Sequence, residues 1–188
     1  VLGVEIKQFA GGGHRTLTPR VVGQTEQAQV KKGSTRQTRA WSEQAILDAI
    51  GMRHGSEERD AAIKFLEWIR PRVDEMSVGT GATDAGIVPT ITTATQSIGI
   101  CRLRTHGTIA FRLRLLAADP AFESESERVE LIDRLNRIDG VEFSRDDLSK
   151  SLQVPLTAIT TDAAATALQA AVAWMIERVR ASITHRKA

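Results

Sequence analysis

The chain has 188 residues, which suits one domain with or without an appendage and is enough to bury a real core. Hydrophobic residues make up 41% and charged residues 26%, which is ordinary for a soluble globular protein. The formal net charge is only +2, which excludes bulk charge as a source of nucleic-acid affinity, so any such affinity requires local clusters of cations.

The single cysteine excludes an internal disulfide, and Cys101, which alternates with apolar neighbours, is expected to be a small buried hydrophobe. No run is long and apolar enough to span a membrane, and no signal-peptide pattern is present. We therefore expect a cytoplasmic protein, in a reducing compartment and without a membrane partner. Because Val1 falls inside a strand-like run, we also expect the chain to be a fragment of a longer protein.

The N-terminal part predicts a strand and a helix that stand apart from the rest. Residues 1–9 alternate as a short strand does, and three consecutive glycines follow it. A proline followed by apolar residues at helical spacing predicts a helix from about residue 19 to residue 32. The polar and basic stretch 33–39 predicts a linker. We therefore divide the chain into residues 1–40 and residues 41–188.

Glu5 and Lys7 form the candidate catalytic pair of the sequence, because positions i and i+2 of a strand project from the same face. The Glu5 carboxylate can hold a divalent metal through oxygen. The Lys7 ammonium can orient water or stabilise charge on a phosphate. Since the tripeptide Glu-x-Lys is common, a surface ion pair on an edge strand is the alternative.

Four amphipathic stretches in residues 41–188 predict helices with apolar stripes at helical spacing. We expect these helices to begin at Ser42, at Ser56, at Ser124 and at Thr161 or Asp162. Between the second and the third of them, strands are predicted at residues 76–79 and 87–92, and Pro89 suggests an edge strand. A hairpin over residues 98–116 completes an antiparallel sheet of about four strands. The predicted fold is α+β, with helices covering one face of that sheet.

The turn of the hairpin decides which of its side chains are buried. A three-residue loop, Thr105–Gly107, pairs Leu103 with Ile109 and places Gly107 in the left-handed position that a bulged turn requires. A slip of one residue would bury arginines, so this register is predicted. The apolar side then holds Cys101, Leu103, Ile109, Phe111, Leu113 and Leu115, and the opposite side holds Arg102, Arg104, Arg112 and Arg114.

The four arginines allow three interpretations. Antiparallel sheets often have one solvated face, and that face needs no ligand. A cluster of guanidinium groups also suits bidentate contact with the phosphates of DNA or RNA. A protein partner with an acidic patch is the third alternative, and the residues alone leave all three open.

Residues 3–9, GVEIKQF, the glycine-rich gap and residues 19–25, PRVVGQT, together resemble the second half of the PD-(D/E)XK nuclease-like core. In that family a core helix follows the strand that carries the Glu-x-Lys motif. The resemblance covers about the first 40 residues. It implies that Glu5 is a metal ligand, that Lys7 is its electrostatic partner, and that Arg20 or Gln24 touches a phosphate.

Much of the remainder resembles the C-terminal region that is attached to such cores in uncharacterised bacterial proteins, for example at residues 105–115 and 135–141. No activity comes with this second resemblance. The family carries another acidic metal ligand on the strand before the Glu-x-Lys strand, and nothing precedes Val1. We therefore expect Mg²⁺-dependent nuclease activity only in the full-length parent, and neither activity nor cofactor in this fragment.

Two functions follow from these observations. The first is that of a nuclease-like, nucleic-acid-interacting protein whose C-terminal domain grips phosphates through the arginine side of the hairpin. The alternative is a non-enzymatic interaction domain that binds a protein partner.

Overall fold

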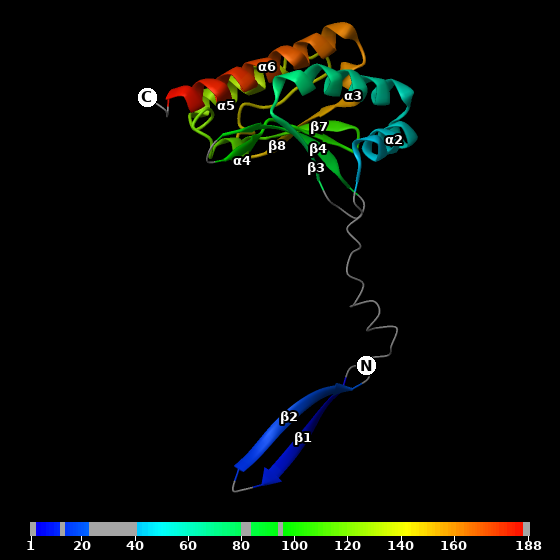
Figure 1. The fold of residues 1–188 in the computed structure, drawn as a ribbon, viewed down its shortest axis with the longest axis vertical. Helices are drawn as coiled ribbons and strands as arrows, with labels where there is room; N and C mark the ends of the chain where they lie inside the picture. Colours follow the sequence, from blue (N-terminus) through cyan, green and yellow to red (C-terminus); the bar gives the residue numbers. More distant parts are fainter. Residues whose placement is uncertain (1–2, 12–13, 23–40, 80–83, 94–95, 186–188) are drawn as a thin grey trace. The chain divides into compact units, whose positions relative to one another are not determined.

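The chain divides into two compact units, Val1–Thr38 and Arg39–Ala188, and each is described by itself. Within the larger unit, side chains are described only between Trp41 and Ile183. The computed structural model describes residues 3–11, 14–22, 41–79, 84–93 and 96–185 (Figure 1).

The smaller unit contains a two-stranded antiparallel hairpin. Strand β1 (Gly3–Gly11) pairs along its whole length with β2 (His14–Val22). The predicted strand at the N-terminus is thus present, but the helix predicted from residue 19 is wrong over residues 19–22, which belong to β2. Threonines and valines favour β2 as a strand, and both strands of a two-stranded ribbon are edges, where proline is tolerated. The rest of that predicted helix lies outside the described residues.

The larger unit contains, within its described residues, a six-stranded antiparallel sheet with the order β3-β4-β6-β7-β8, in which β5 also pairs with β4. The α+β fold with an antiparallel sheet is confirmed, and the sheet has six strands where about four were expected. The strands are β3 (Glu75–Val78), β4 (Gly86–Thr92), β5 (Ser97–Gly99), β6 (Arg102–Arg104), β7 (Thr108–Arg112) and β8 (Ser151–Pro155).

Strand β4 is an interior strand, although Pro89 predicted an edge. On one side β4 pairs with β3, and on the other side it pairs first with β6 and then with β5. Pro89 falls between the β6 and β5 pairings, where the ladder is interrupted. The missing N–H of the proline therefore removes no ladder bond, while the Pro89 carbonyl accepts a hydrogen bond from Ile100 N at 2.9 Å.

The β6–β7 hairpin has the predicted register, in which Leu103 is opposite Ile109 and Arg104 is opposite Thr108. Gly107 has a φ of +70°, in the left-handed region, and its N–H donates to the Arg104 carbonyl at 3.1 Å. Leu103, Ile109 and Phe111 are all completely buried, as the alternation predicts.

The strand period ends at Arg112, because a short helix, α4 (Leu113–Leu116), follows directly. In a helix the side chains three and four positions apart share a face, so Leu113 and Leu116 are buried while Leu115 is 52% exposed. The prediction that Leu115 belongs to the core is therefore wrong. The same turn removes Arg114 from the sheet.

Four longer helices begin at or within one residue of the predicted starts. They are α2 (Glu43–His54), α3 (Ser56–Ile69), α5 (Glu125–Leu135) and α6 (Asp162–His185). Two 3₁₀ turns, η1 (Arg70–Arg72) and η2 (Leu156–Ile159), follow α3 and β8. Figure 1 shows α3, α5 and α6 on one side of the sheet. None of the helices in the described part of the chain has the length and apolar character that crossing a bilayer requires.

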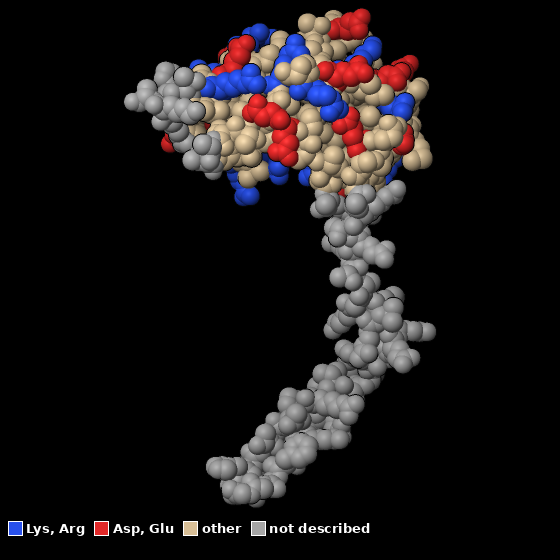
Figure 2. Space-filling model, in the orientation of Figure 1, with Lys and Arg blue, Asp and Glu red and all other residues tan. Residues whose placement is uncertain are grey.

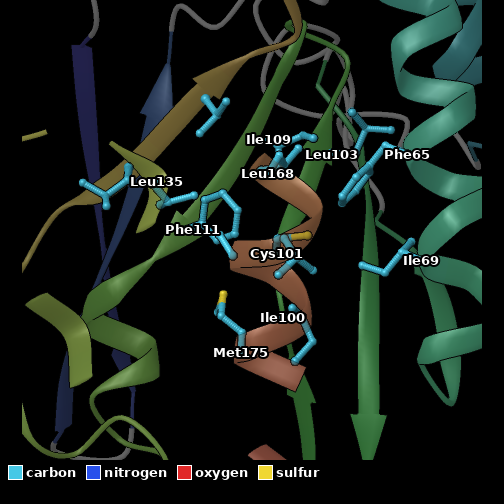
Figure 3. Close-up of a cluster of buried hydrophobic side chains, with 14 of the residues drawn as sticks. Phe65, Ile69, Ile100, Cys101, Leu103, Ile109, Phe111, Leu135, Leu168 and Met175 are labelled. Carbon is cyan, nitrogen blue, oxygen red and sulfur yellow. The ribbon is translucent and has the colours of Figure 1, made fainter. Parts of the chain in front are cut away.

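The core lies between the sheet and these helices. Figure 3 shows Leu103 and Phe111 of the hairpin in one cluster with Phe65 of α3 and with Leu168 and Met175 of α6. Cys101 belongs to the same cluster, and burial raises the pKa of its thiol to about 12. A thiol held in that state is a small hydrophobe, as predicted, and does not act as a nucleophile at neutral pH.

The turn at Gly107 makes a testable prediction, with Gly140 as the control. Both glycines have positive φ, but a Cβ at Gly107 would lie 2.8 Å from Cδ2 of His54, whereas a Cβ at Gly140 would meet nothing within 4 Å. Both alanine variants carry the left-handed strain of about 1–2 kcal/mol. In urea titrations Gly107→Ala should lower the free energy of unfolding by about 1 kcal/mol more than Gly140→Ala.

This difference should disappear when both variants are made in a His54→Ala background, which removes the ring. Equal destabilisation by Gly107→Ala and Gly140→Ala in the natural background would show that the His54 contact plays no part.

Candidate functional site

The candidate site is the face of the sheet that lies opposite the helices, which we call the open face. Directly opposed residues of neighbouring strands point to the same face of the sheet. The register therefore identifies which residues of each strand point to the open face. In β8, for example, every second residue is exposed and those between are buried. The outward positions of the central strands are Gly86, Val88, Thr90, Arg102, Arg104, Thr108, Ala110, Arg112, Ser151, Gln153 and Pro155.

Arg102 lies across the neighbouring strand β4, over Gly86. A Cβ at Gly86 would come within 2.6 Å of Arg102 Nε, and a Cβ at Gly79 would lie 3.3 Å from Arg102 Nη2. The glycines therefore make room for the arginine side chain. Arg102 Nε is buried and has no hydrogen-bond partner, and Arg102 forms no salt bridge within the described ranges. The charge of Arg102 is thus not balanced by an acidic side chain among the described residues.

Arg104 is engaged by a carboxylate, because its Nη2 donates to Asp84 Oδ2. The completely buried Thr105 donates through Oγ1 to Asp84 Oδ1 at 3.0 Å, and His106 Nε2 lies 3.6 Å from the same oxygen. Burial alone would raise the pKa of Asp84, but the hydrogen bonds from Arg104 and Thr105 outweigh it and hold that pKa below its usual 3.8. The Asp84 cluster therefore ties the start of β4 to the hairpin and balances the charge of Arg104.

Arg112 and Arg114 have different positions, although they were predicted to share one face. Arg112 is the last residue of β7, opposite Ser151, and it is exposed on the open face. Arg114 is exposed on α4 and is not part of the sheet. Among the described residues neither arginine forms a salt bridge. Of the four predicted arginines, Arg102 and Arg112 are thus the two that are both on the open face and uncommitted.

A groove of about 290 Å³ opens beside Arg112, and we call it the Arg112 groove. Its lining includes Leu115 and Gln96, and Gln96 Nε2 donates to Asp119 Oδ2 at 3.3 Å. The residues that line it are Val88, Gln96, Ser97, Ile98, Gly99, Ile100, Cys101, Ala110, Arg112, Leu115, Leu116, Ala118 and Asp119.

A second groove, of about 360 Å³, lies between α3, η2 and α6 and is lined by Glu57, Asp60, Lys64 and Asp162 among others. Asp162 is in the first turn of α6, where the helix dipole favours a carboxylate. In the part of the chain that the structure describes, no three His, Cys, Asp or Glu side chains are grouped to hold a metal ion. The described residues of these two grooves therefore do not form a metal site.

The nuclease-like residues are placed by strand register alone. Glu5 and Lys7 are on β1 as predicted, and they are opposite Arg20 and Thr18 of β2. Arg20 is therefore on a strand and not on the helix that follows the Glu-x-Lys strand in the nuclease-like family. Gln24 lies outside the described residues.

No family model, no curated protein and no solved structure matches the chain. The resemblance to the nuclease-like core therefore stays a prediction from the sequence.

The sequence did not predict the Asp84 cluster or the Arg112 groove. Asp84 was part of a glycine-rich loop with no assigned partner, and it meets Arg104 across a separation of 20 residues. The groove depends on the helical turn at Leu113, which interrupts the alternation that predicted a continuous strand.

The Asp84 cluster predicts a pH-dependent contribution to stability. The pKa of Asp84 is lowered in the folded chain, so the carboxylate stabilises the fold above its usual pKa of 3.8 and loses that effect as pH falls through the folded value. Asp84→Asn should lower the free energy of unfolding at neutral pH by about 1–3 kcal/mol, because Arg104 and Thr105 lose their charged acceptor.

Urea titrations at neutral pH and in acid test this. The difference between wild type and Asp84→Asn should shrink in acid, whereas Asp139→Asn, a change of an exposed carboxylate, should have little effect at either pH. A difference that is constant with pH would contradict the assigned role of Asp84.

Proposed function

We propose that the open face binds the phosphates of a nucleic acid, and that the chain is part of a nuclease-like protein whose C-terminal domain holds the substrate in this way. The observation that carries the proposal is the state of Arg102 and Arg112, whose guanidinium groups have no acidic partner among the described residues. Guanidinium groups bind phosphate through two parallel hydrogen bonds.

The contrast with the helix side supports this choice of surface. There Arg70, Arg134 and Arg178 pair with Glu43, Glu130 and Glu127 respectively. Figure 2 shows basic and acidic side chains interspersed over the helices. Such a surface has no extended field of one sign, and its exposed ion pairs need no ligand.

The proposed nuclease activity depends on Glu5 and Lys7 and is independent of phosphate binding by the open face. β1 and β2 contain one acidic residue, Glu5, and the register places the cationic residue Arg20 opposite it. One carboxylate does not complete a site for Mg²⁺, so the residues of this hairpin do not fit the metal by themselves. Nuclease activity would therefore require further acidic ligands from outside this hairpin.

A protein partner with an acidic surface is the second candidate. It is favoured by Leu115, an apolar side chain that is 52% exposed beside Arg112. Binding of nucleic acid to the isolated chain, competed by salt, separates the two functions, because phosphate contacts give a steep and regular salt dependence.

Arg112→Glu tests the phosphate contact. It should weaken binding of a fluorescein-labelled oligonucleotide about tenfold in anisotropy titrations, and it should reduce the salt dependence by about one phosphate contact. Lys64→Glu makes the same change of charge on α3, in the helix layer, and should leave affinity within about twofold.

Circular dichroism of both variants controls for folding. Equal losses of affinity for Arg112→Glu and Lys64→Glu would indicate an effect of net charge alone, and no loss for either would contradict the proposed contact.

A further inference from the structure

The Arg112 groove has more apolar surface than phosphate binding alone requires. A phosphate needs cationic and N–H donors, whereas Val88 and Ala110 form part of the lining on the open face and Leu115 stands beside them. Leu115 is 52% exposed, although the leucines on both sides of it in α4, Leu113 and Leu116, are buried. A groove with both apolar and polar lining, beside an arginine that forms no salt bridge with the described residues, suits a ligand with an anionic group joined to a partly apolar group.

Local backbone structure forms this hollow. The chain leaves the sheet after Arg112 and turns into α4, and Leu115 then borders the groove. Gly99 and Ala110 have small side chains and so leave space in the groove. A Cβ at Gly99 would come within 2.9 Å of Val88 Cγ1. The groove therefore combines residues of the core, such as Ile100 and Cys101, with Gly99 and Leu115, which are exposed.

Two polar side chains of the groove, Gln96 and Asp119, are oriented by hydrogen bonds. Asp119 Oδ1 accepts from Ala121 N at 2.9 Å, and Asp119 Oδ2 accepts from Gln96 Nε2 at 3.3 Å. These two bonds fix the Asp119 carboxylate and direct the Gln96 amide. The Gln96 amide can donate and accept hydrogen bonds at the edge of a heterocycle, whereas the Asp119 carboxylate can only accept them.

We propose that the Arg112 groove holds one unstacked nucleobase of a single-stranded nucleic acid, while Arg112 contacts the adjoining phosphate. This inference rests on the proposed function and names its substrate class. The volume of about 290 Å³ is at the lower end of the range for ligand sites, so it suits one base rather than a larger group. Paired and stacked bases of a duplex cannot enter it, and the open face should therefore prefer single strands.

Anisotropy titrations with three labelled probes of one length test this: a single strand, the same strand with abasic sites, and a duplex. The single strand should bind roughly fivefold tighter than the abasic strand and the duplex, because only its bases can fill the groove. Leu115→Ser should reduce the affinity for the single strand to that for the abasic strand, and should leave the abasic strand unaffected.

Met52→Ser is the matched control, since Met52 is an apolar side chain that is 82% exposed on α2 and is not part of the groove. It should change no affinity. Equal binding of all three probes, unchanged by Leu115→Ser but weakened by Arg112→Glu, would overturn the groove inference and leave phosphate binding in place. No binding of any probe, with or without Arg112→Glu, would overturn the proposed function and this inference together.

Discussion

The left-handed backbone of Gly107 is the constraint on which the rest of the larger unit depends. Its φ of +70° closes the three-residue loop between β6 and β7 and thereby fixes their register. A slip of one residue would exchange the two faces and place Arg102 in the core in place of Leu103. The apolar residues of the hairpin can pack against α3 and α6 only in the observed register, because they then share one side of the sheet.

The same register gives the outward arginines two different roles. Arg104 meets Asp84 and helps to hold the start of β4 against the hairpin, so its charge contributes to the fold. Arg102 and Arg112 lack such a partner among the described residues, and their charges are available to a ligand. Gly86 matters to this division because its missing Cβ leaves space for Arg102 to lie across β4.

The sequence predicted those features that depend on local periodicity. The starts of the long helices, the register of the hairpin and the burial of Cys101 all follow from spacing and turn chemistry within short stretches. Features that depend on distant partners were missed. Pro89 suggested an edge, yet β4 is paired on both sides, and the proline is tolerated because the neighbouring strand changes from β6 to β5 at that residue. The sequence of residues 113–116, LRLL, fits a strand as well as a helical turn. A prediction from alternation alone therefore continued the strand beyond Arg112 and assigned Leu115 to the core.

The candidate site was predicted in part for the same reason. The alternation placed Arg102, Arg104 and Arg112 on one face, but only the fold shows which of them is balanced by an acid and which borders a groove. The most direct test of the account is a titration of the isotopically labelled chain with a single-stranded oligonucleotide, followed through its backbone amide resonances. The account predicts the largest shifts at Val88, Gly99, Ala110 and Arg112, and shifts confined to α3 and α6 would contradict it.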